Sequence, residues 1–200
     1  MGKAFTEDER ILVQEKLRRT GLKLFRENGI KGVSIRQLTA AAGIAQGGFY
    51  TFYKDKFDFL LDIIEFRINE KLADMKAHWD ASLKDPLGYL AEQMYEEGMR
   101  LTNNKAFDNA ISGTLDIYQN VDIETTGRIR NLYQKYYEEL FAFWGKNGYK
   151  VKADLEGLLW AVRMESFMIT NASYMDKDYM KKILKSFCKG VVNDFLKVSR

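Results

Sequence analysis

The stretch SIRQLTAAAGIAQGGFYTFY, residues 34–53, decides the fold of this 200-residue chain. Ser34 and Gln37 are spaced as a capping box that starts a short helix, and Gly43 ends that helix in a tight turn. A second short helix is expected at about residues 46–52. Two short helices joined by a glycine-containing turn form a helix-turn-helix, whose second helix enters the major groove of DNA. The motif therefore predicts a DNA-binding segment.

Longer helices are expected on both sides of this motif. Upstream, a capping box at Thr6 predicts a helix that ends at about Asn28. Downstream, Asp55 caps a helix that starts at Lys56 and could extend to Ser82. The first three helices would form the DNA-binding domain, and the fourth would begin the rest of the chain.

The remaining sequence has the 3.6-residue apolar spacing of helices. Further helices are expected at about residues 87–103, 107–118, 124–146, 153–175 and 176–198. The sequence thus predicts an all-α protein of about nine helices with no convincing strand. We expect residues 1–55 to form the DNA-binding domain and residues 56–200 a helical effector-binding and dimerisation domain.

Composition narrows the class of protein. The one cysteine, Cys188, excludes an internal disulfide, and its apolar neighbours predict a buried thiol. No apolar stretch approaches 18 residues, and no secretory signal is expected, so we expect a cytoplasmic protein. The net charge is +4 over residues 1–60 and −1 over residues 61–200. A basic N-terminal segment followed by a nearly neutral remainder of the chain favours a nucleic-acid partner.

An enzyme is the main alternative from another class, and the sequence speaks against it. The single histidine, His78, has no glutamate three residues before it, so no di-iron pair can form there. No phosphate-binding loop or dinucleotide glycine motif occurs. We therefore expect no enzyme activity, no metal and no cofactor.

The chemistry of the second short helix separates DNA binding from a plain helical hairpin. Gly47 and Gly48 let a partner approach the backbone closely. Around them lie hydroxyl and ammonium groups that can hold phosphates: Tyr50, Tyr53, Lys54 and Lys56. A helical interaction module without DNA binding stays open as an alternative.

The register of several positions resembles the TetR family of transcriptional repressors over about residues 11–70. The positions that carry the resemblance are Leu38, Ala42, Gly43, Gly47, Tyr50, Lys56 and Leu60. The chain departs from the family's usual residues at Thr39, Ala45, Gly48, Tyr53 and Phe57. Ala45 in particular lacks the side chain that would cap the recognition helix.

The resemblance implies a role for each matching position in DNA binding. Tyr50 and Lys56 would hold phosphates, and Gln46 and Thr51 would read bases. Ser34 and Arg36 would contact the DNA backbone or a groove edge. The full predicted DNA-binding set is Ser34, Arg36, Gln46, Gly47, Gly48, Tyr50, Thr51, Tyr53, Lys54 and Lys56.

The resemblance also implies that the C-terminal helices hold an unknown small-molecule effector and form a homodimer on operator DNA. The candidate ligand residues are Phe107, Asp116, Tyr133, Tyr137, Phe141, Trp160, Arg163 and Phe167. The candidate dimer residues are Gly157, Ala161, Phe187, Val191 and Phe195. Both sets could instead be core within one subunit. An architectural or cell-cycle factor on the same scaffold, without small-molecule control, is the alternative function.

Overall fold

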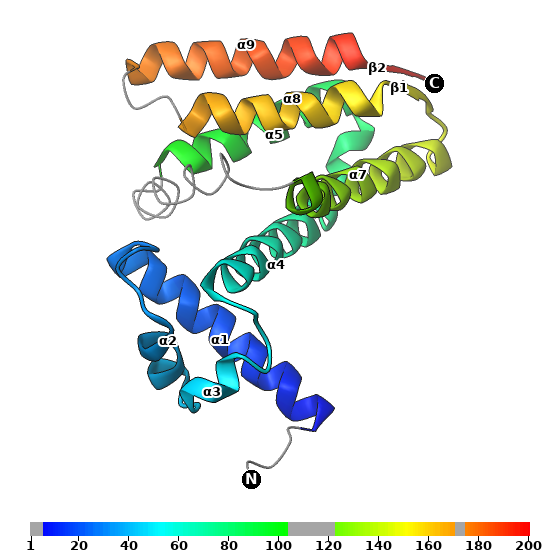
Figure 1. The fold of residues 1–200 in the computed structure, drawn as a ribbon. Helices are drawn as coiled ribbons and strands as arrows, with labels where there is room; N and C mark the ends of the chain where they lie inside the picture. Colours follow the sequence, from blue (N-terminus) through cyan, green and yellow to red (C-terminus); the bar gives the residue numbers. More distant parts are fainter. Residues whose placement is uncertain (1–5, 104–122, 171–174) are drawn as a thin grey trace. The chain divides into compact units, whose positions relative to one another are not determined.

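The computed structural model describes residues 6–103, 123–170 and 175–200, and Figure 1 shows their course. These ranges contain eight α-helices, one 3-10 helix and two short strands. Residues up to Ile68 pack as one compact unit, and the described residues from Asn69 onward pack as a second. The division falls inside the fourth helix, whereas the sequence places it at the start of that helix.

The N-terminal unit contains α1 (Glu7–Asn28), α2 (Ile35–Ala42), α3 (Gln46–Phe49) and the first part of α4 (Lys56–Lys76). Both expected capping boxes are confirmed, at Thr6 before α1 and at Ser34 before α2. Gly43 ends α2 in the left-handed conformation, with φ of 69°, which glycine adopts at little cost. Local sequence signals thus define the limits of the first two helices.

Phe59 on α4 lies at the centre of the core of this unit. Its ring is fully buried and lies 5.5 Å from the ring of Phe49, 4.8 Å from that of Tyr53 and 6.1 Å from that of Phe25. Gly21 on α1 provides the space for this packing, because a Cβ atom there would lie 2.7 Å from Phe59 Cζ. The core therefore joins α1, α3 and α4 at one point.

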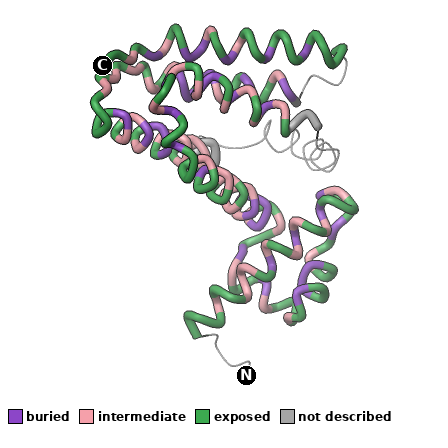
Figure 2. The backbone as a smooth tube through the Cα atoms, turned by 180° about the vertical axis from the view of Figure 1, so that it is seen from behind, coloured by how far each residue is buried: buried purple, intermediate pink, exposed green. Residues whose placement is uncertain are grey.

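The second unit contains the 3-10 helix η1 (Trp79–Leu83) and the helices α5 (Pro86–Asn103), α7 (Ile123–Lys146), α8 (Leu155–Thr170) and α9 (Lys177–Phe195). Helix α5 packs against both α8 and α9. Buried polar atoms are paired here, since Trp79 Nε1 donates to the Tyr136 hydroxyl at 3.0 Å and Trp144 Nε1 donates to Ser82 Oγ at 2.6 Å. Figure 2 shows buried positions recurring between exposed ones along these helices.

The structure corrects several predicted elements. Residues Lys150–Ala153 and Leu196–Ser199 form an antiparallel pair of strands, β1 and β2, although no strand was expected. Helix α9 consequently ends at Phe195, and α4 ends at Lys76 before η1. Helix α3 is shorter than predicted, since residues after Phe49 form turns. The helix predicted at 107–118 lies outside the described residues.

Two further expectations can be compared with the described residues. Cys188 is buried, as its apolar neighbours predict. None of the helices in the described ranges is both long and apolar enough to cross a membrane.

Candidate functional site

The helix-turn-helix consists of α2, the turn at Gly43 and the four residues of α3. Phe49 is the buried residue of α3, and it holds this short helix on the core. Gln46 and Gly47 are exposed, as are Tyr50 and Thr51 directly after the helix. Helix α3 therefore turns an apolar side to the protein and a polar side to solvent.

Tyr53 is part of the scaffold that holds α3. Its ring is buried, and its hydroxyl donates to Asp62 Oδ2 at 2.7 Å. Arg18 on α1 donates two hydrogen bonds to the same carboxylate, at 2.7 and 2.6 Å. Burial, followed by the bond to Asp62, raises the pKa of Tyr53. The predicted phosphate contact of Tyr53 is therefore wrong, because its hydroxyl is already occupied inside the unit.

Lys56 also has partners within the protein. Its Nζ donates to the backbone carbonyl oxygens of Ile30 and Val33, both at 2.9 Å. These carbonyls belong to the connection between α1 and α2, so Lys56 ties the start of α4 to the entrance of the helix-turn-helix. The family resemblance implies a phosphate contact at Lys56, and the structure adds this internal role that the sequence reasoning missed.

Exposed polar side chains lie on α3, on α2 and on the segment that follows α3. Arg36, Gln46, Thr51 and Lys54 are exposed, and their side chains make no hydrogen bond or ion pair with the described residues. Tyr50 is 56% exposed, and its ring packs edge-on against Phe49. Ser34 has a different role, because its hydroxyl is bonded to Gln37 as the cap of α2. The structure thus brings five of the predicted residues together with their polar atoms directed to solvent.

Gly47 and Gly48 open α3 itself. A Cβ atom at Gly47 would meet nothing within 4 Å, and one at Gly48 would meet only Ile44 Cδ1 at 3.8 Å. Neither has a positive φ. Each glycine costs roughly 1 kcal/mol relative to alanine in a helix interior. Packing and backbone conformation within the chain therefore do not require glycine at these two positions.

The second unit has a group of ionisable side chains that lie partly buried between its helices. Lys71 on α4 forms an ion pair with Glu97 on α5 at 3.3 Å and donates to the Tyr133 hydroxyl on α7 at 3.3 Å. Burial alone would lower the pKa of Lys71, but Tyr133 and Glu97 outweigh it, so the pKa is raised. Lys71 therefore joins three helices through its ammonium group.

Glu165 on α8 extends this interior polar group. It is 7% exposed, and it accepts a hydrogen bond from the Cys188 thiol, with Sγ 3.8 Å from Oε1. Burial raises the pKa of Glu165 to about 7, although the charge of Lys71 acts in the opposite direction. Gly98 makes room for the carboxylate, since a Cβ atom there would lie 2.7 Å from Oε1. The sequence reasoning missed Lys71 and Glu97, because spacing alone does not show which charges are partly buried.

The residues predicted to bind a ligand do not form one cluster. Tyr137 is buried and stacks on Phe141 with ring centroids 6.1 Å apart, and Tyr133 contacts Lys71. Trp160 and Phe167 on α8 are instead 54% and 58% exposed, and Arg163 lies over the Trp160 ring. These three residues therefore lie on the surface of the described unit. Phe107 and Asp116 lie outside the described residues.

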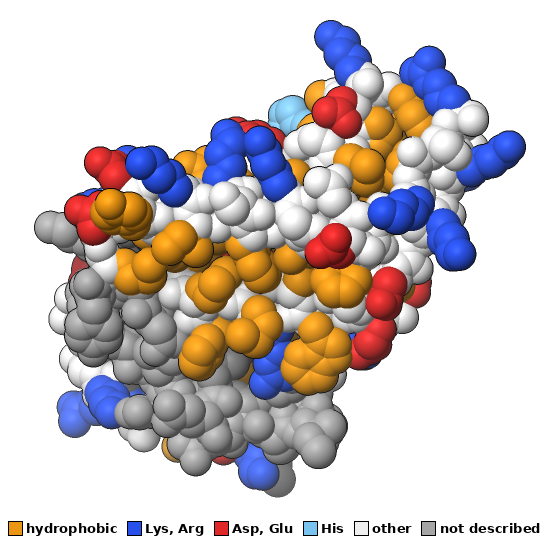
Figure 3. Space-filling model, turned by 90° about the horizontal axis from the view of Figure 1, so that it is seen from above, with side chains coloured by type: hydrophobic (Ala, Val, Ile, Leu, Met, Phe, Trp, Pro, Cys, Tyr) orange, Lys and Arg blue, Asp and Glu red, His pale blue; other side chains and the backbone are white. Residues whose placement is uncertain are grey.

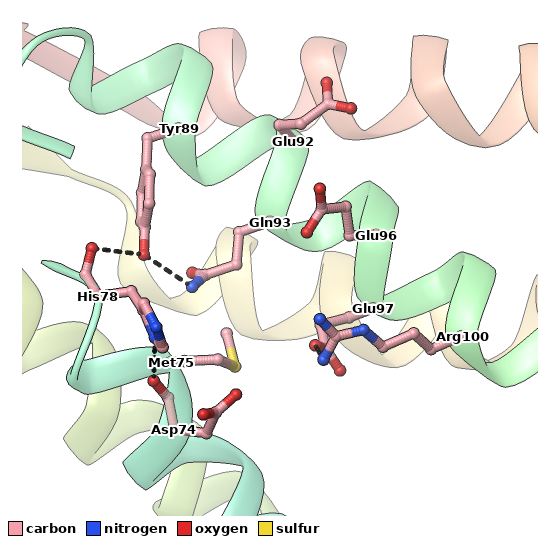
Figure 4. Close-up of a pocket in the computed structure, with 9 residues that line it drawn as sticks. All are labelled: Asp74, Met75, His78, Tyr89, Glu92, Gln93, Glu96, Glu97 and Arg100. Carbon is pink, nitrogen blue, oxygen red and sulfur yellow. Dashed lines mark hydrogen bonds and ion pairs between the residues drawn. The ribbon is translucent and has the colours of Figure 1, made fainter. Parts of the chain in front are cut away.

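A pocket of about 310 Å³ lies between the end of α4 and one side of α5 (Figure 4). Its walls include Met75, Tyr89 and Gln93, and Gln93 Nε2 donates to the Tyr89 hydroxyl at 3.1 Å. Four acidic residues and one arginine also line it: Asp74, Glu92, Glu96, Glu97 and Arg100. The sequence-based ligand set contained none of these residues.

Four of the five predicted dimer residues pack against their own subunit, and the fifth, Phe187, is half-buried. Ala161 and Val191 are buried, and a Cβ atom at Gly157 would collide with the Phe195 ring. The exposed apolar face of α8 and α9 consists of other residues, namely Trp160, Met164, Phe167, Tyr179 and Ile183, and the exposed Met175 lies just before α9. Figure 3 looks onto these helices from above and shows hydrophobic side chains gathered in one patch. The two predicted helices do present an apolar surface, but other residues form it.

Comparison with known proteins defines the class of this fold. Residues 17–63 match the family model of bacterial regulatory proteins of the tetR family. The uncharacterized HTH-type transcriptional regulator YerO of Bacillus subtilis is 27% identical over 128 residues, which cover 59% of this chain and 44% of that protein. The HTH-type transcriptional regulator AcrR of Shigella flexneri is 31% identical over 72 residues, or 36% and 33% of the two chains. The matched segments thus span less than half of these relatives.

Solved structures extend the similarity of fold to nearly the whole chain. The structure of RolR in complex with resorcinol has a TM-score of 0.69 at 14% identity and covers 95% of this chain and 90% of that one. The protein is a helix-turn-helix domain joined to a helical C-terminal domain. Its residues 17–63 form a DNA-binding domain of the TetR family of transcriptional regulators. This is not a family of enzymes, in agreement with the prediction from the sequence.

The internal bonds of Lys56 predict that two neighbouring lysines differ in their effect on stability. We expect Lys56→Met to lower the melting temperature, because the Val33 carbonyl loses its Lys56 donor, at about 1–3 kcal/mol for an unsatisfied group, and the Ile30 carbonyl keeps only a 3.4 Å bond from Val33 N. Lys54→Met, which removes an exposed ammonium, should leave the melting temperature unchanged. Thermal unfolding followed by circular dichroism measures both, and equal melting temperatures would contradict the internal role of Lys56.

Glu165 predicts a pH dependence of stability. Its pKa in the folded state is about 7, above the ordinary value of 4.5, so the unfolded chain loses this proton first as the pH rises. Stability should therefore fall between about pH 4.5 and 7, by up to about 3 kcal/mol, and that contribution is absent above this range. Glu165→Gln should remove the fall and be the more stable form at pH 8. The exposed Glu96→Gln is the matched control, and parallel denaturation profiles for wild type and Glu165→Gln would refute the prediction.

Proposed function

We propose that the protein is a transcriptional repressor that binds palindromic operator DNA as a homodimer and is released by a small-molecule ligand. The observation that supports DNA binding is the group of exposed polar side chains on and next to α3, namely Arg36, Gln46, Tyr50, Thr51 and Lys54. Their polar atoms are directed to solvent, and the apolar side of α3 is held on the core by Phe49. This is the arrangement that a recognition helix needs to contact bases and phosphates in the major groove.

Within this proposal the side chains divide by chemistry. Gln46 is the candidate to read adenine, since its amide can form two hydrogen bonds with that base, and Thr51 is a second base reader. Lys54, Tyr50 and Arg36 would contact phosphates or a groove edge. Lys56 supports the site from within, because its ammonium holds the connection between α1 and α2.

The exposed apolar face of α8 and α9 supports the homodimer. A face with Trp160, Phe167, Tyr179 and Ile183 in contact with water is costly, and a second copy would bury it. Two copies of the α8–α9 pair would then form a four-helix bundle, and a twofold dimer reads a palindrome.

The ligand part of the proposal rests on the second unit and on similarity of fold. RolR was solved with resorcinol, so this fold holds a small molecule in a relative. In this chain the pocket beside α4 and the interior charges at Lys71 and Glu165 are candidate contacts. Because α4 begins in the DNA-binding unit and ends in the second unit, a ligand that favours one position of α4 would change the spacing of the recognition helices. The protein would act in the cytoplasm, where its DNA lies.

Selection of bound sequences from random duplex DNA tests the repressor proposal. We expect a palindromic consensus and an affinity that falls steeply with salt concentration. Gln46→Ala should relax the preference at one position in each half-site, and Lys54→Met should lower the salt slope by about 1. No enrichment from a folded dimer would contradict operator binding. Operator binding that no small molecule weakens would favour the architectural factor instead.

The dimer face can be tested separately. Ile183 is 45% exposed on α9, and Ile183→Glu would place a charge in the proposed interface. We expect this variant to be a monomer in analytical ultracentrifugation at concentrations where the wild type is a dimer, and to lose operator affinity. Lys189→Glu, also exposed on α9 but outside the apolar face, is the control and should stay a dimer. A dimeric Ile183→Glu variant would place the interface elsewhere.

A further inference from the structure

Two adjacent glycines in a helix of only four residues need an explanation that the chain itself does not provide. Some of the other described glycines have a clear internal reason, whereas Gly127, Gly145 and Gly190 have none. A Cβ atom at Gly21 would collide with Phe59 and Ile63, and Gly43 has a φ of 69°. Gly47 and Gly48 have neither kind of reason, although both weaken the helix. What they leave is a patch of bare backbone, which is directed to solvent beside Gln46.

Apart from the Gly47 amide, which no side chain caps, the surface that these glycines expose is apolar. The amide of Gly48 is engaged, since it donates to the Ala45 carbonyl at 2.9 Å, and the Cα atoms offer only C–H groups. On one side lies Gln46, whose amide is suited to adenine, and on the other side lies the exposed Tyr50. A small apolar group that lies next to a base edge would fit the open space at these glycines.

We propose that Gly47 and Gly48 determine specificity by letting a thymine methyl group of the operator pack directly on the backbone of α3. The thymine C5 methyl is the apolar group that base edges present in the major groove. Adenine, which Gln46 can read, is paired with thymine, so one A·T pair or two neighbouring pairs satisfy both features. This inference rests on the proposed DNA binding and adds the chemistry of one contact to it.

Glycine at positions 47 and 48 should then lower the stability of the fold while it raises the affinity for the operator. Gly47→Ala and Gly48→Ala each add a methyl group where the protein has open space, and each improves helix propensity. We expect the melting temperature to rise by about 1–4 °C. Operator affinity should fall about tenfold or more, the size of a mismatched base pair, because the added methyl occupies the place of the thymine methyl. Gly145→Ala, also in a helix with nothing within 4 Å of the added Cβ, is the matched control and should keep wild-type affinity.

Replacement of the operator thymines by deoxyuridine, one position at a time, gives the decisive test, because uracil lacks only the methyl group. The probes are the selected operator and its uracil versions, and the readout is the dissociation constant by fluorescence anisotropy. At one position the wild type should bind the uracil operator about fourfold more weakly, having lost one buried methyl. At that same position the uracil operator should restore the affinity of Gly48→Ala to within about threefold of the wild type.

Each result leads to a definite conclusion. Alanine variants that bind like Gly145→Ala overturn the close approach, and a lower melting temperature shows that the fold itself requires the glycines. The absence of a uracil effect at every position overturns the thymine contact. In these cases the wild type still selects an operator, so the proposed function stands. A wild type that selects no operator overturns the proposed function, and the inference fails with it.

Discussion

The contact of Phe49 and Tyr53 with the buried ring of Phe59 is the constraint on which the DNA-binding unit depends. A helix of four residues such as α3 is not stable alone, because nucleation costs more than so few hydrogen bonds return. Its position is therefore set by side chains, with ring centroids 5.5 and 4.8 Å from Phe59. Gly21 lets α1 approach the same ring. A change at Phe59 would thus displace α3 without touching any residue that faces solvent.

Polar bonds set the remaining orientation of this unit. Dispersion and burial hold rings together but leave small rotations open, whereas hydrogen bonds have a direction. Asp62 accepts from Tyr53 and from Arg18, and so links the turn after α3 to α1. Lys56 links the start of α4 to the connection before α2. These bonds explain why a tyrosine and a lysine beside a recognition helix can serve the scaffold.

The sequence predicted features whose cause is local. The capping boxes at Thr6 and Ser34, the stop at Gly43 and the uncapped start at Ala45 all depend on a few neighbouring residues, and all are found. It failed where the cause is distant. The four-residue strand Leu196–Ser199 exists because Lys150–Ala153 lies beside it, and no periodicity in so short a segment shows that pairing. Asp62, which interrupts the apolar run from Phe59 to Ile64, was a signal for a paired charge within the core.

Distant contacts also decide which side of α8 is buried, and the sequence pattern does not show them. Both sides of this helix are apolar, so spacing alone cannot tell which side meets its own subunit. The small residues Gly157 and Ala161 fit close to α9, and the large residues Trp160, Met164 and Phe167 are left outside. The small side chains at Gly157 and Ala161 allow close packing within the subunit, whereas exposed aromatic residues and methionine are the types enriched at the core of protein interfaces. On this physical ground the large residues, and not the small ones, define where a second copy would bind.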